Sequence, residues 1–469
     1  MIDTNLIYLS QAEAAKLIEK REVSPLDLTD ACIARAETLD ATLHAYLTMT
    51  FETARQEARA AGEEIAAGKY RGPLHGVPFA IKDLYDTAGV LTTYGSRVTE
   101  HNVPAEDART VELLKQAGVV MLGKLNLHEW AMGGTNINEY YPTPRNPWDT
   151  QRVTGGSSGG SGAALAAGYC YGSLGTDTRG SVRIPAAHNS ITGIKPTWGR
   201  VSIRGIAPLS WSLDHSGPMA RTAEDCALIL NVIAGYDERD PTSADMPVPD
   251  YAAALTPQSL EGVRVGVPRN FFFDPGVVDP VMVSATRTAG EVLASLGAEV
   301  VDVDFPEGIE FQQASALFAE ATLAHESRFK EHPELYGETI RQRLANSTAI
   351  SGADYVRDRW QQLELQQAVR HLMREIDLVL TPTSPILAPK IADVDTSPTS
   401  TLNPLLLRHT SPFNVSANPA ITMPGGFSED GLPIGVQLAG RWWEEGLVLR
   451  AAHAYQQVTD WHKQRPPLG

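Results

Sequence analysis

The sequence lacks the features that would cross-link the chain or hold it in a membrane. Its 469 residues include three cysteines, Cys32, Cys170 and Cys226, an odd number at distant positions. This usage argues against a disulfide framework and predicts a reducing, cytoplasmic compartment. No run reaches about 18 apolar residues, so no membrane span is expected. The N-terminus has no basic segment followed by an apolar one, so no signal peptide is expected.

Positive charge is also scarce. The chain has 39 Lys and Arg against 56 Asp and Glu, a formal net charge of −17. Phosphate backbones and anionic lipids both attract basic patches. We therefore expect neither nucleic acid nor a membrane surface as a partner.

The motifs of common cofactor and metal sites are absent. Neither Gly-rich tract ends in the Lys-Ser/Thr of a Walker A loop, and no GxGxxG follows a predicted strand. His128–Glu129 begins like a zinc-protease helix, but Met132 stands where the second His is required. No other His/Cys cluster suggests a metal, so we expect no metal and no cofactor.

Strand and helix patterns alternate through most of the chain. Short apolar, β-branched runs predict strands at 77–82, 119–123, 263–267, 299–303 and 378–381. Periodic or capped segments predict helices beginning after Ser10 and Ser24, and at 51–67, 109–117, 223–234 and 444–458. This alternation indicates an α/β layered fold.

Three tracts interrupt the alternation. Residues 152–162 and 175–187 are rich in Gly, Ser and Thr, and residues 382–404 are rich in Pro, Thr and Ser. A flexible linker is one explanation of the first two, although apolar sequence continues on both sides of them. The third predicts a surface excursion.

The first tract contains the GxSxG pattern of a nucleophile elbow at Gly155 to Gly159. An elbow requires a hydrophobic strand directly before the serine. Residues 145–154 are polar and include Pro147, and such a pattern arises easily by coincidence in a Gly-rich tract. The elbow is therefore the less favoured interpretation.

A serine hydrolase can use a lysine in place of histidine, provided that the lysine is neutral and within reach of the hydroxyl. Burial can lower a lysine pKa from about 10.4 towards roughly 7–8. Lys82 ends the apolar segment VPFAIK, where a buried lysine would face a site. An ordinary strand-end lysine that reaches solvent is the alternative, because lysines are rarely fully buried.

At these residues the sequence resembles the amidase-signature family. The central match runs from Gly155 to Gly168 (GGSSGGSGAALAAG) and from Gly175 to Ala187 (GTDTRGSVRIPAA). Further segments match in the same order, spanning roughly residues 10–467: PLHGVPFAIKD at 73–83, GKLNLHEWAMG at 123–133, GIKPTWGR at 193–200, SLDHSGPM at 212–219 and GLPIGVQLAGR at 431–441.

The resemblance implies a Ser–cisSer–Lys triad. It assigns the nucleophile to Ser181, the proton relay to Ser157 and the base to Lys82. In the family the relay serine follows a cis peptide, which predicts a cis bond between Gly156 and Ser157. The acyl-enzyme formed on Ser181 would divide one difficult step into two easier ones.

The same resemblance implies the surroundings of the nucleophile. Backbone N–H groups of Thr178, Arg179, Gly180 and Ser181 are expected to form an oxyanion hole. Asp177 and Arg183 are expected to support this turn, with a surface ion pair as the alternative. The expected substrate-binding residues are Trp130, Met132, Gly133, Gly134, Ser158 and Arg179. Tyr336 and Arg341 are further pocket candidates in the less matched segment 311–353.

Arg179 departs from the family, which usually has Gly at this position. An arginine can donate its backbone N–H equally well unless the position needs a positive φ. Its side chain either pairs with an acid elsewhere, which is the favoured interpretation, or lines the pocket and favours a carboxylate-bearing substrate.

The expected architecture is one amidase-signature domain over residues 1–469, with a central mixed β-sheet covered by helices on both sides. N-terminal helices occupy about 1–70, the signature core about 71–235 and a specificity region about 300–400. The expected activity is hydrolysis of a small-molecule amide, with carbamates and esters as further substrates and a homodimer left open. The alternative is the glutamine-hydrolysing subunit of a tRNA-dependent amidotransferase, which works with partner chains.

Overall fold

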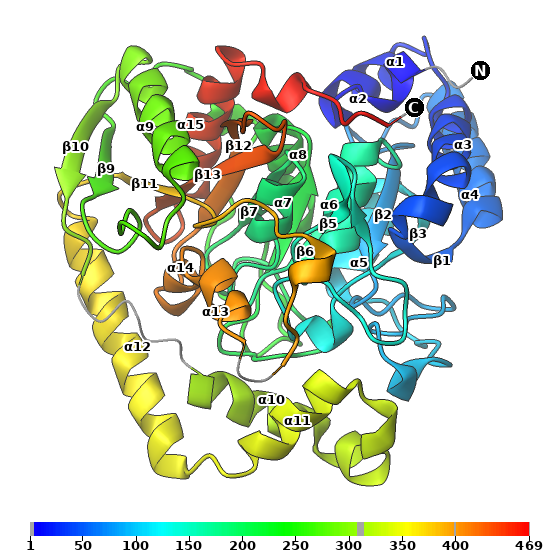
Figure 1. Ribbon diagram of the computed structural model, residues 1–469. Helices are drawn as coiled ribbons and strands as arrows, with labels where there is room; N and C mark the ends of the chain where they lie inside the picture. Colours follow the sequence, from blue (N-terminus) through cyan, green and yellow to red (C-terminus); the bar gives the residue numbers. More distant parts are fainter. Residues whose placement is uncertain (1–3, 307–313, 398–399, 469) are drawn as a thin grey trace.

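The computed structural model describes residues 4–306, 314–397 and 400–468, and a large mixed β-sheet runs through it (Figure 1). Its eleven strands follow the order β1-β3-β2-β6-β8-β7-β12-β13-β11-β9-β10. The strands of this sheet are β1 Tyr46–Met49, β2 Pro78–Lys82, β3 Val120–Leu125, β6 Gly172–Thr176, β7 Thr192–Lys195, β8 Ser216–Ala220, β9 Arg264–Pro268, β10 Glu299–Val303, β11 Leu378–Pro382, β12 Ala420–Phe427 and β13 Pro433–Gly440.

Two further short strands, β4 Arg145–Asn146 and β5 Asp149–Val153, form a separate hairpin. The strand that precedes Gly155 to Gly159 therefore lies outside the main sheet. An elbow at Ser157 would need a core strand there, so the nucleophile-elbow interpretation is wrong.

Helices surround the sheet. They are α1 Thr4–Ile7, α2 Gln11–Glu19, α3 Pro25–Leu43, α4 Phe51–Ala66, α5 Arg109–Ala117, α6 Gly159–Ala167, α7 Arg183–His188, α8 Ala223–Ile233, α9 Pro280–Ser295, α10 Ala314–Glu331, α11 Glu338–Ser347, α12 Gly352–Leu372, α13 Leu402–Leu407, α14 Ser411–Val415 and α15 Glu445–Gln457.

Both faces of the sheet are covered, as the sequence predicts. Successive residues of a strand point to opposite faces. On β13, a Cβ added at Gly435 would meet Ala187 of α7 at 2.4 Å, and one added at Gly440 would meet Val448 of α15 at 2.5 Å. These two glycines are an odd number of residues apart, so α7 and α15 lie on opposite faces.

The predicted elements with strong hydrophobic patterns are confirmed. β10 and α5 begin and end where the sequence places them, and the bounds of β2, β9, β11, α4, α8 and α15 differ from expectation by one or two residues. Ser10 and Ser24 each accept a hydrogen bond from the backbone of the residue three positions later, so both cap their helices. All three cysteines are free and buried.

The interpretation of the first Gly/Ser tract as a linker is wrong. Its last residues, 159–162, begin the buried helix α6, and the second tract contains the end of β6 and the start of α7. Glycine is required here by close packing. A Cβ at Gly160 would lie 2.5 Å from the backbone nitrogen of Asn126, closer than real Cβ atoms approach other atoms.

Helices α10, α11 and α12 form a separate group along the lower and left edges of the molecule in Figure 1. They belong to the region of about 300–400 that is predicted to set specificity, of which residues 307–313 and 398–399 lie outside the described residues. Tyr336 is buried in a hydrophobic cluster, whereas Arg341 is exposed and pairs with Glu338. Neither therefore faces a substrate cavity directly.

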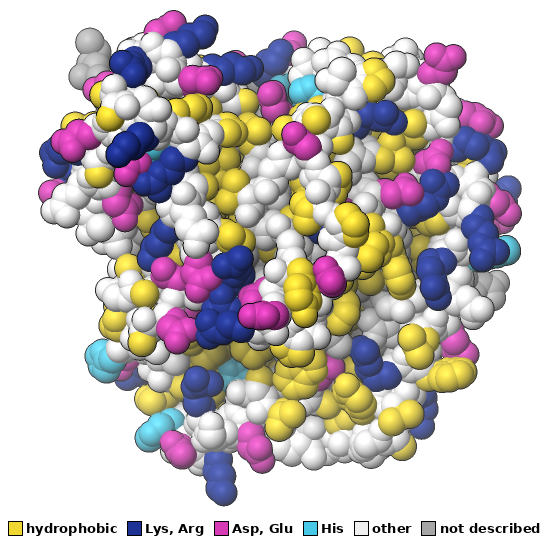
Figure 2. All heavy atoms as spheres, turned by 180° about the vertical axis from the view of Figure 1, so that it is seen from behind, with side chains coloured by type: hydrophobic (Ala, Val, Ile, Leu, Met, Phe, Trp, Pro, Cys, Tyr) yellow, Lys and Arg dark blue, Asp and Glu magenta, His cyan; other side chains and the backbone are white. Residues whose placement is uncertain are grey.

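No helix in the described part of the chain is long and apolar enough to cross a membrane. On the face shown in Figure 2, acidic and basic side chains are interspersed.

Candidate functional site

The candidate site lies where two neighbouring strands end. β2 and β6 are parallel and hydrogen-bonded, so their carboxyl ends meet at the same edge of the sheet. Lys82 is the last residue of β2, and Thr176 is the last residue of β6. Sheet topology thus brings together two polar side chains that are 94 residues apart in sequence.

Lys82 is fully buried and contacts two hydroxyl groups. Its Nζ donates hydrogen bonds to Ser157 Oγ at 2.8 Å and to Thr176 Oγ1 at 2.6 Å. Burial lowers the pKa of Lys82 from 10.5 to about 7, against the opposing influence of the Asp214 and Asp177 carboxylates. Near neutral pH this lysine can therefore exist in the neutral form that accepts a proton.

Two other buried lysines have different surroundings. Lys124 Nζ lies 3.2 Å from an oxygen of the buried Asp83 carboxylate. Lys195 Nζ donates to the carbonyls of Asn418 and Pro196 and lies 3.2 Å from His215 Nε2. Of these three lysines, only Lys82 hydrogen-bonds to a serine hydroxyl.

Ser157 lies in the Gly-rich loop before α6. The peptide bond between Gly156 and Ser157 is cis, which confirms the prediction. The loop packs closely, because a Cβ at Gly156 would lie 2.7 Å from the backbone nitrogen of Asn136. The backbone N–H of His128 donates to the Ser157 carbonyl at 3.1 Å, so the loop is anchored on both sides of this serine.

Ser181 lines a small cavity that is partly open to solvent. Within the described residues its hydroxyl makes no hydrogen bond, so the expected Ser181–Ser157 link is not formed in this structure, whereas the Ser157–Lys82 link is. Catalytic hydrogen bonds are often long or misaligned without substrate and tighten when it binds.

The turn before Ser181 contains one position that requires glycine. Gly180 has φ of +140°, and a Cβ there would lie 2.2 Å from Thr410 Oγ1, so glycine is needed. Arg179 is not among the residues with positive φ, so an arginine fits at this position without strain. Thr178 Oγ1 donates to Asp214 Oδ1 at 2.6 Å, and Thr410 Oγ1 donates to the Arg179 carbonyl at 2.6 Å.

Asp177 and Arg183 form a bidentate ion pair with both side chains fully buried, so the alternative of a surface pair does not hold. Arg183 Nη2 lies 2.9 Å from Asp177 Oδ1, and Nε lies 2.9 Å from Oδ2. Arg183 and Lys195 together hold the pKa of Asp177 well below its usual range despite burial. Arg183 also donates to Asn414 Oδ1 and Gln437 Oε1 at 2.6 and 2.7 Å.

The structure places only some of the expected substrate residues around Ser181. The residues that line its cavity are Ala131, Met132, Gly133, Thr178, Arg179, Ser181, Leu209, Leu317, Phe318, Arg343, Asn403 and Leu407. Met132, Gly133 and Arg179 are thus at the cavity. Ser158 is fully buried beside β6, and the Gly134 N–H donates to Asn403 Oδ1 at 2.7 Å. Neither is part of the lining.

Trp130 packs in the hydrophobic core beside the site. Its ring centroid lies 4.9 Å from that of Tyr94 and 4.4 Å from that of His325, and its side chain is almost fully buried. It supports the segment that carries Met132 and Gly133 without reaching the cavity.

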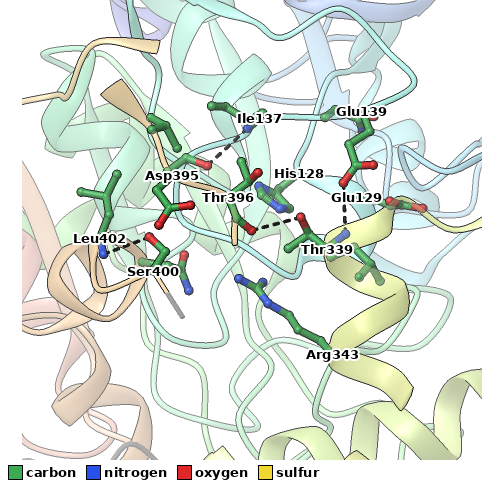
Figure 3. Close-up of a pocket in the computed structure, with 15 residues that line it drawn as sticks. His128, Glu129, Ile137, Glu139, Thr339, Arg343, Asp395, Thr396, Ser400 and Leu402 are labelled. Carbon is green, nitrogen blue, oxygen red and sulfur yellow. Dashed lines mark hydrogen bonds between the residues drawn. The ribbon is translucent and has the colours of Figure 1, made fainter. Parts of the chain in front are cut away.

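A second small cavity adjoins the first through Arg343 and Asn403, which line both. Figure 3 shows Arg343 projecting into it from α11, with His128 at its centre and Asp395 and Ser400 across from the helix. Glu129, at its edge, accepts from Ser96 Oγ at 2.5 Å and from the Gly337 N–H at 3.0 Å. Burial raises the pKa of Glu129 to about 7.

Three residues of the site, Thr176, Asp214 and Arg343, are not predicted from the sequence. Thr176 lies within the matched segment 175–187, so the sequence shows that it is close to Ser181. Its contact with Lys82 cannot be predicted from the sequence. Arg343 lies on α11, where only the tertiary packing of the helix shows which of its arginines faces the site.

These observations define a mixed-sheet α/β fold in which a buried lysine hydrogen-bonds to a serine at the ends of two parallel strands. A family model described as Amidase matches residues 27–449. The chain therefore belongs to the amidase-signature family, whose members are hydrolases acting on C–N bonds.

Individual relatives cover almost the whole chain. One subunit of the glutamyl-tRNA(Gln) amidotransferase of Chloroflexus aggregans is 41% identical over 490 residues, covering 99% of each chain. The structure of the corresponding subunit from Thermotoga maritima superposes with a TM-score of 0.82 at 32% identity, covering 98% of this chain and 96% of that one. A 6-aminohexanoate cyclic dimer hydrolase complexed with substrate superposes with a TM-score of 0.89 at 28% identity, covering 98% and 99%.

The two amidotransferase relatives contradict the expectation of a small-molecule substrate with no nucleic acid. They carry the name of one component of an enzyme that acts on tRNA(Gln). The expectation rested on the net charge of a single chain. Net charge limits how strongly that chain itself binds anions such as nucleic acid. In an assembly, other chains can make the contacts with an anionic partner.

Proposed function

We propose that Ser181 attacks the carbonyl carbon of a primary amide, with Ser157 as relay and neutral Lys82 as base. The observation that carries the proposal is the 2.8 Å contact between Lys82 and Ser157 at a lysine whose pKa is about 7. As the Ser181 oxygen bonds to carbon, its proton passes to Ser157, whose own proton passes to Lys82.

The remaining steps complete the hydrolysis. The tetrahedral oxyanion is held by N–H groups of the 178–181 turn, and the C–N bond breaks as protonated Lys82 returns its proton through Ser157 to the leaving nitrogen. Ammonia leaves and the acyl group remains on Ser181 as an ester. Water then attacks this ester by the same route, releasing a carboxylic acid and free Ser181.

At a finer level, we propose that the protein is the glutamine-hydrolysing subunit of a tRNA-dependent amidotransferase. Support comes from relatives of that name at 41% identity over 99% of both chains. In such an assembly the acyl-enzyme step releases ammonia from glutamine for transfer elsewhere, and the tRNA contacts belong to the assembly.

The test measures ammonia released from glutamine by the purified chain, alone and with the other subunits of a bacterial amidotransferase, with and without tRNA. Release that requires the subunits and rises with tRNA supports the proposal. Equal release by the chain alone in all conditions would reject the subunit role while leaving the amidase chemistry in place.

A second candidate is an amidohydrolase that acts on another amide without such subunits. Arg179 favours it, because this residue replaces the usual Gly beside the nucleophile and lines the Ser181 cavity. The comparison that separates the candidates is the rate on glutamine against the rate on other primary amides, measured with the chain alone.

A further inference from the structure

Two arginines reach the Ser181 cavity from different parts of the chain. Arg179 belongs to the nucleophile turn, and Arg343 belongs to α11. They are the only charged side chains among the described residues that line this cavity. The cavity wall therefore combines two cationic groups with apolar side chains such as Leu317, Phe318 and Leu407.

Neither arginine is neutralised within the described part of the chain. Arg179 Nε donates to the neutral hydroxyl of Ser411 at 3.0 Å, and an Arg343 guanidinium nitrogen donates to the Met132 carbonyl. No carboxylate of the described residues lies within ion-pair distance of either guanidinium. The expectation that Arg179 pairs with an acid is therefore not met there.

The contrast with Arg183 shows what a structural arginine looks like in this fold. Arg183 is equally close to the nucleophile in sequence, yet it is matched in bidentate fashion by Asp177 and satisfied by two side-chain amides. Arg179 and Arg343 are each partly buried, and neither has a carboxylate partner among the described residues. An arrangement that leaves two such cations at one cavity is suited to an anionic ligand.

We propose that Arg179 and Arg343 form a carboxylate-binding subsite, so that the substrate is an amide whose acyl part carries a carboxylate. This inference rests on the proposed amide hydrolysis at Ser181 and names the substrate class of that site. Guanidinium groups bind carboxylates through paired, charge-assisted hydrogen bonds. The subsite fixes the acyl part, while the amide carbon faces Ser181.

The same lining residues also indicate that the cavity does not select for an ammonium group on the substrate. The described lining residues include no acid that could hold an ammonium group. Glutamine and glutaramate, the monoamide of a five-carbon dicarboxylic acid, share the amide and the carboxylate, and differ in the α-ammonium of glutamine. The subsite therefore accepts glutaramate at least as well as glutamine, and both far better than pentanamide, which has no carboxylate.

The experiment measures kcat/KM for ammonia release from glutaramate, glutamine and pentanamide with wild type, Arg179→Gln, Arg343→Gln and Arg341→Gln. The last variant is the matched control: Arg341 lies on the same helix as Arg343, is exposed and lines neither cavity. Each of the two cavity variants removes a charged hydrogen-bond donor to the substrate carboxylate. Its loss should lower the ratio of kcat/KM for glutaramate to kcat/KM for pentanamide by about 10-fold or more.

The expected result is a ratio that falls in Arg179→Gln and in Arg343→Gln and is unchanged in Arg341→Gln, with a larger change in KM than in kcat. An unchanged ratio in both cavity variants, or a wild type that prefers pentanamide, would overturn the subsite. Calorimetric binding of glutarate to the Ser181→Ala protein provides a readout independent of catalysis. Failure to release ammonia from any amide, with the other amidotransferase subunits and tRNA present, would reject the proposed function, whereas glutarate binding that is lost in the arginine variants would still support the subsite.

Discussion

Arg183 and Asp177 flank Ser181 in sequence and form a bidentate ion pair at 2.9 Å with both side chains fully buried. The pair thereby connects Asp177, which precedes the 178–181 turn, to Arg183 in the first turn of α7. Because the Val182 N–H also donates to Asp177 at 3.2 Å, the carboxylate holds the backbone directly after the nucleophile.

Asp177→Asn should lower the free energy of unfolding by about 3 kcal/mol, because it leaves Arg183 as a buried charge without a counter-charge. Urea denaturation measures this change. Asp304→Asn is the matched control, since Asp304 pairs with Arg269 at the surface and should cost less than about 1 kcal/mol. Equal losses in the two variants would contradict a supporting role for the Asp177–Arg183 pair.

The activity should depend on the protonation of Lys82. Since its pKa is about 7, the base is protonated below that pH and cannot accept the proton from Ser157. We therefore expect kcat/KM to fall about tenfold per pH unit below neutrality and to level off above it. A pH–rate profile from about pH 5 to about pH 9, with a substrate that does not titrate in this range, checks the prediction; a flat acid limb would exclude Lys82 as the base.

Thr176 should act as a positioning residue for Lys82. Its hydroxyl accepts a hydrogen bond from Lys82 Nζ at 2.6 Å, which stabilises the protonated form more than the neutral one. Thr176→Val preserves the shape and removes the acceptor, so the acid limb of the pH–rate profile should move to lower pH while kcat declines. A loss of kcat with an unmoved limb would indicate a purely structural role.

Gly180→Ala should disrupt the oxyanion turn. The substitution places a Cβ 2.2 Å from Thr410 Oγ1 at φ of +140°, and loss of one oxyanion donor typically costs about 10²–10³ in kcat. Gly426→Ala is the control, because Gly426 has a similar φ of +147° with nothing within 4 Å of the added Cβ. Stability should fall in both variants, but only Gly180→Ala should lose kcat on that scale.

The strands that can be predicted from sequence are those of apolar, β-branched composition. Lys82 is correctly predicted at the end of β2, because a regular pattern ends there. The strands β6, β7 and β8 are not predicted, because their segments GSLGT, TGIK and SGPMA contain the residues that usually interrupt strands. Tertiary packing requires those glycines: a Cβ at Gly172 would lie 2.2 Å from the Phe79 ring.

The residues of the candidate site likewise fall into those that can be predicted from the sequence and those that cannot. The family resemblance supplied Lys82, Ser157 and Ser181, because these residues lie in matched segments with distinctive neighbours. The resemblance also places Trp130 at the pocket, and Arg341 is a candidate from the less matched segment; the structure instead packs Trp130 against Tyr94 and leaves Arg341 at the surface. The position of a side chain on one side of a helix or loop depends on what packs against it, and a single sequence does not record that packing.

The most direct test of the account labels the protein with a neutral fluorophosphonate and locates the adduct by mass spectrometry, in wild type, Lys82→Ala and Ser181→Ala. The account predicts an adduct on Ser181 in wild type, a much slower reaction in Lys82→Ala and none in Ser181→Ala. An adduct on Ser157 or Ser158, or equal labelling rates in wild type and Lys82→Ala, would contradict the assignment of nucleophile and base.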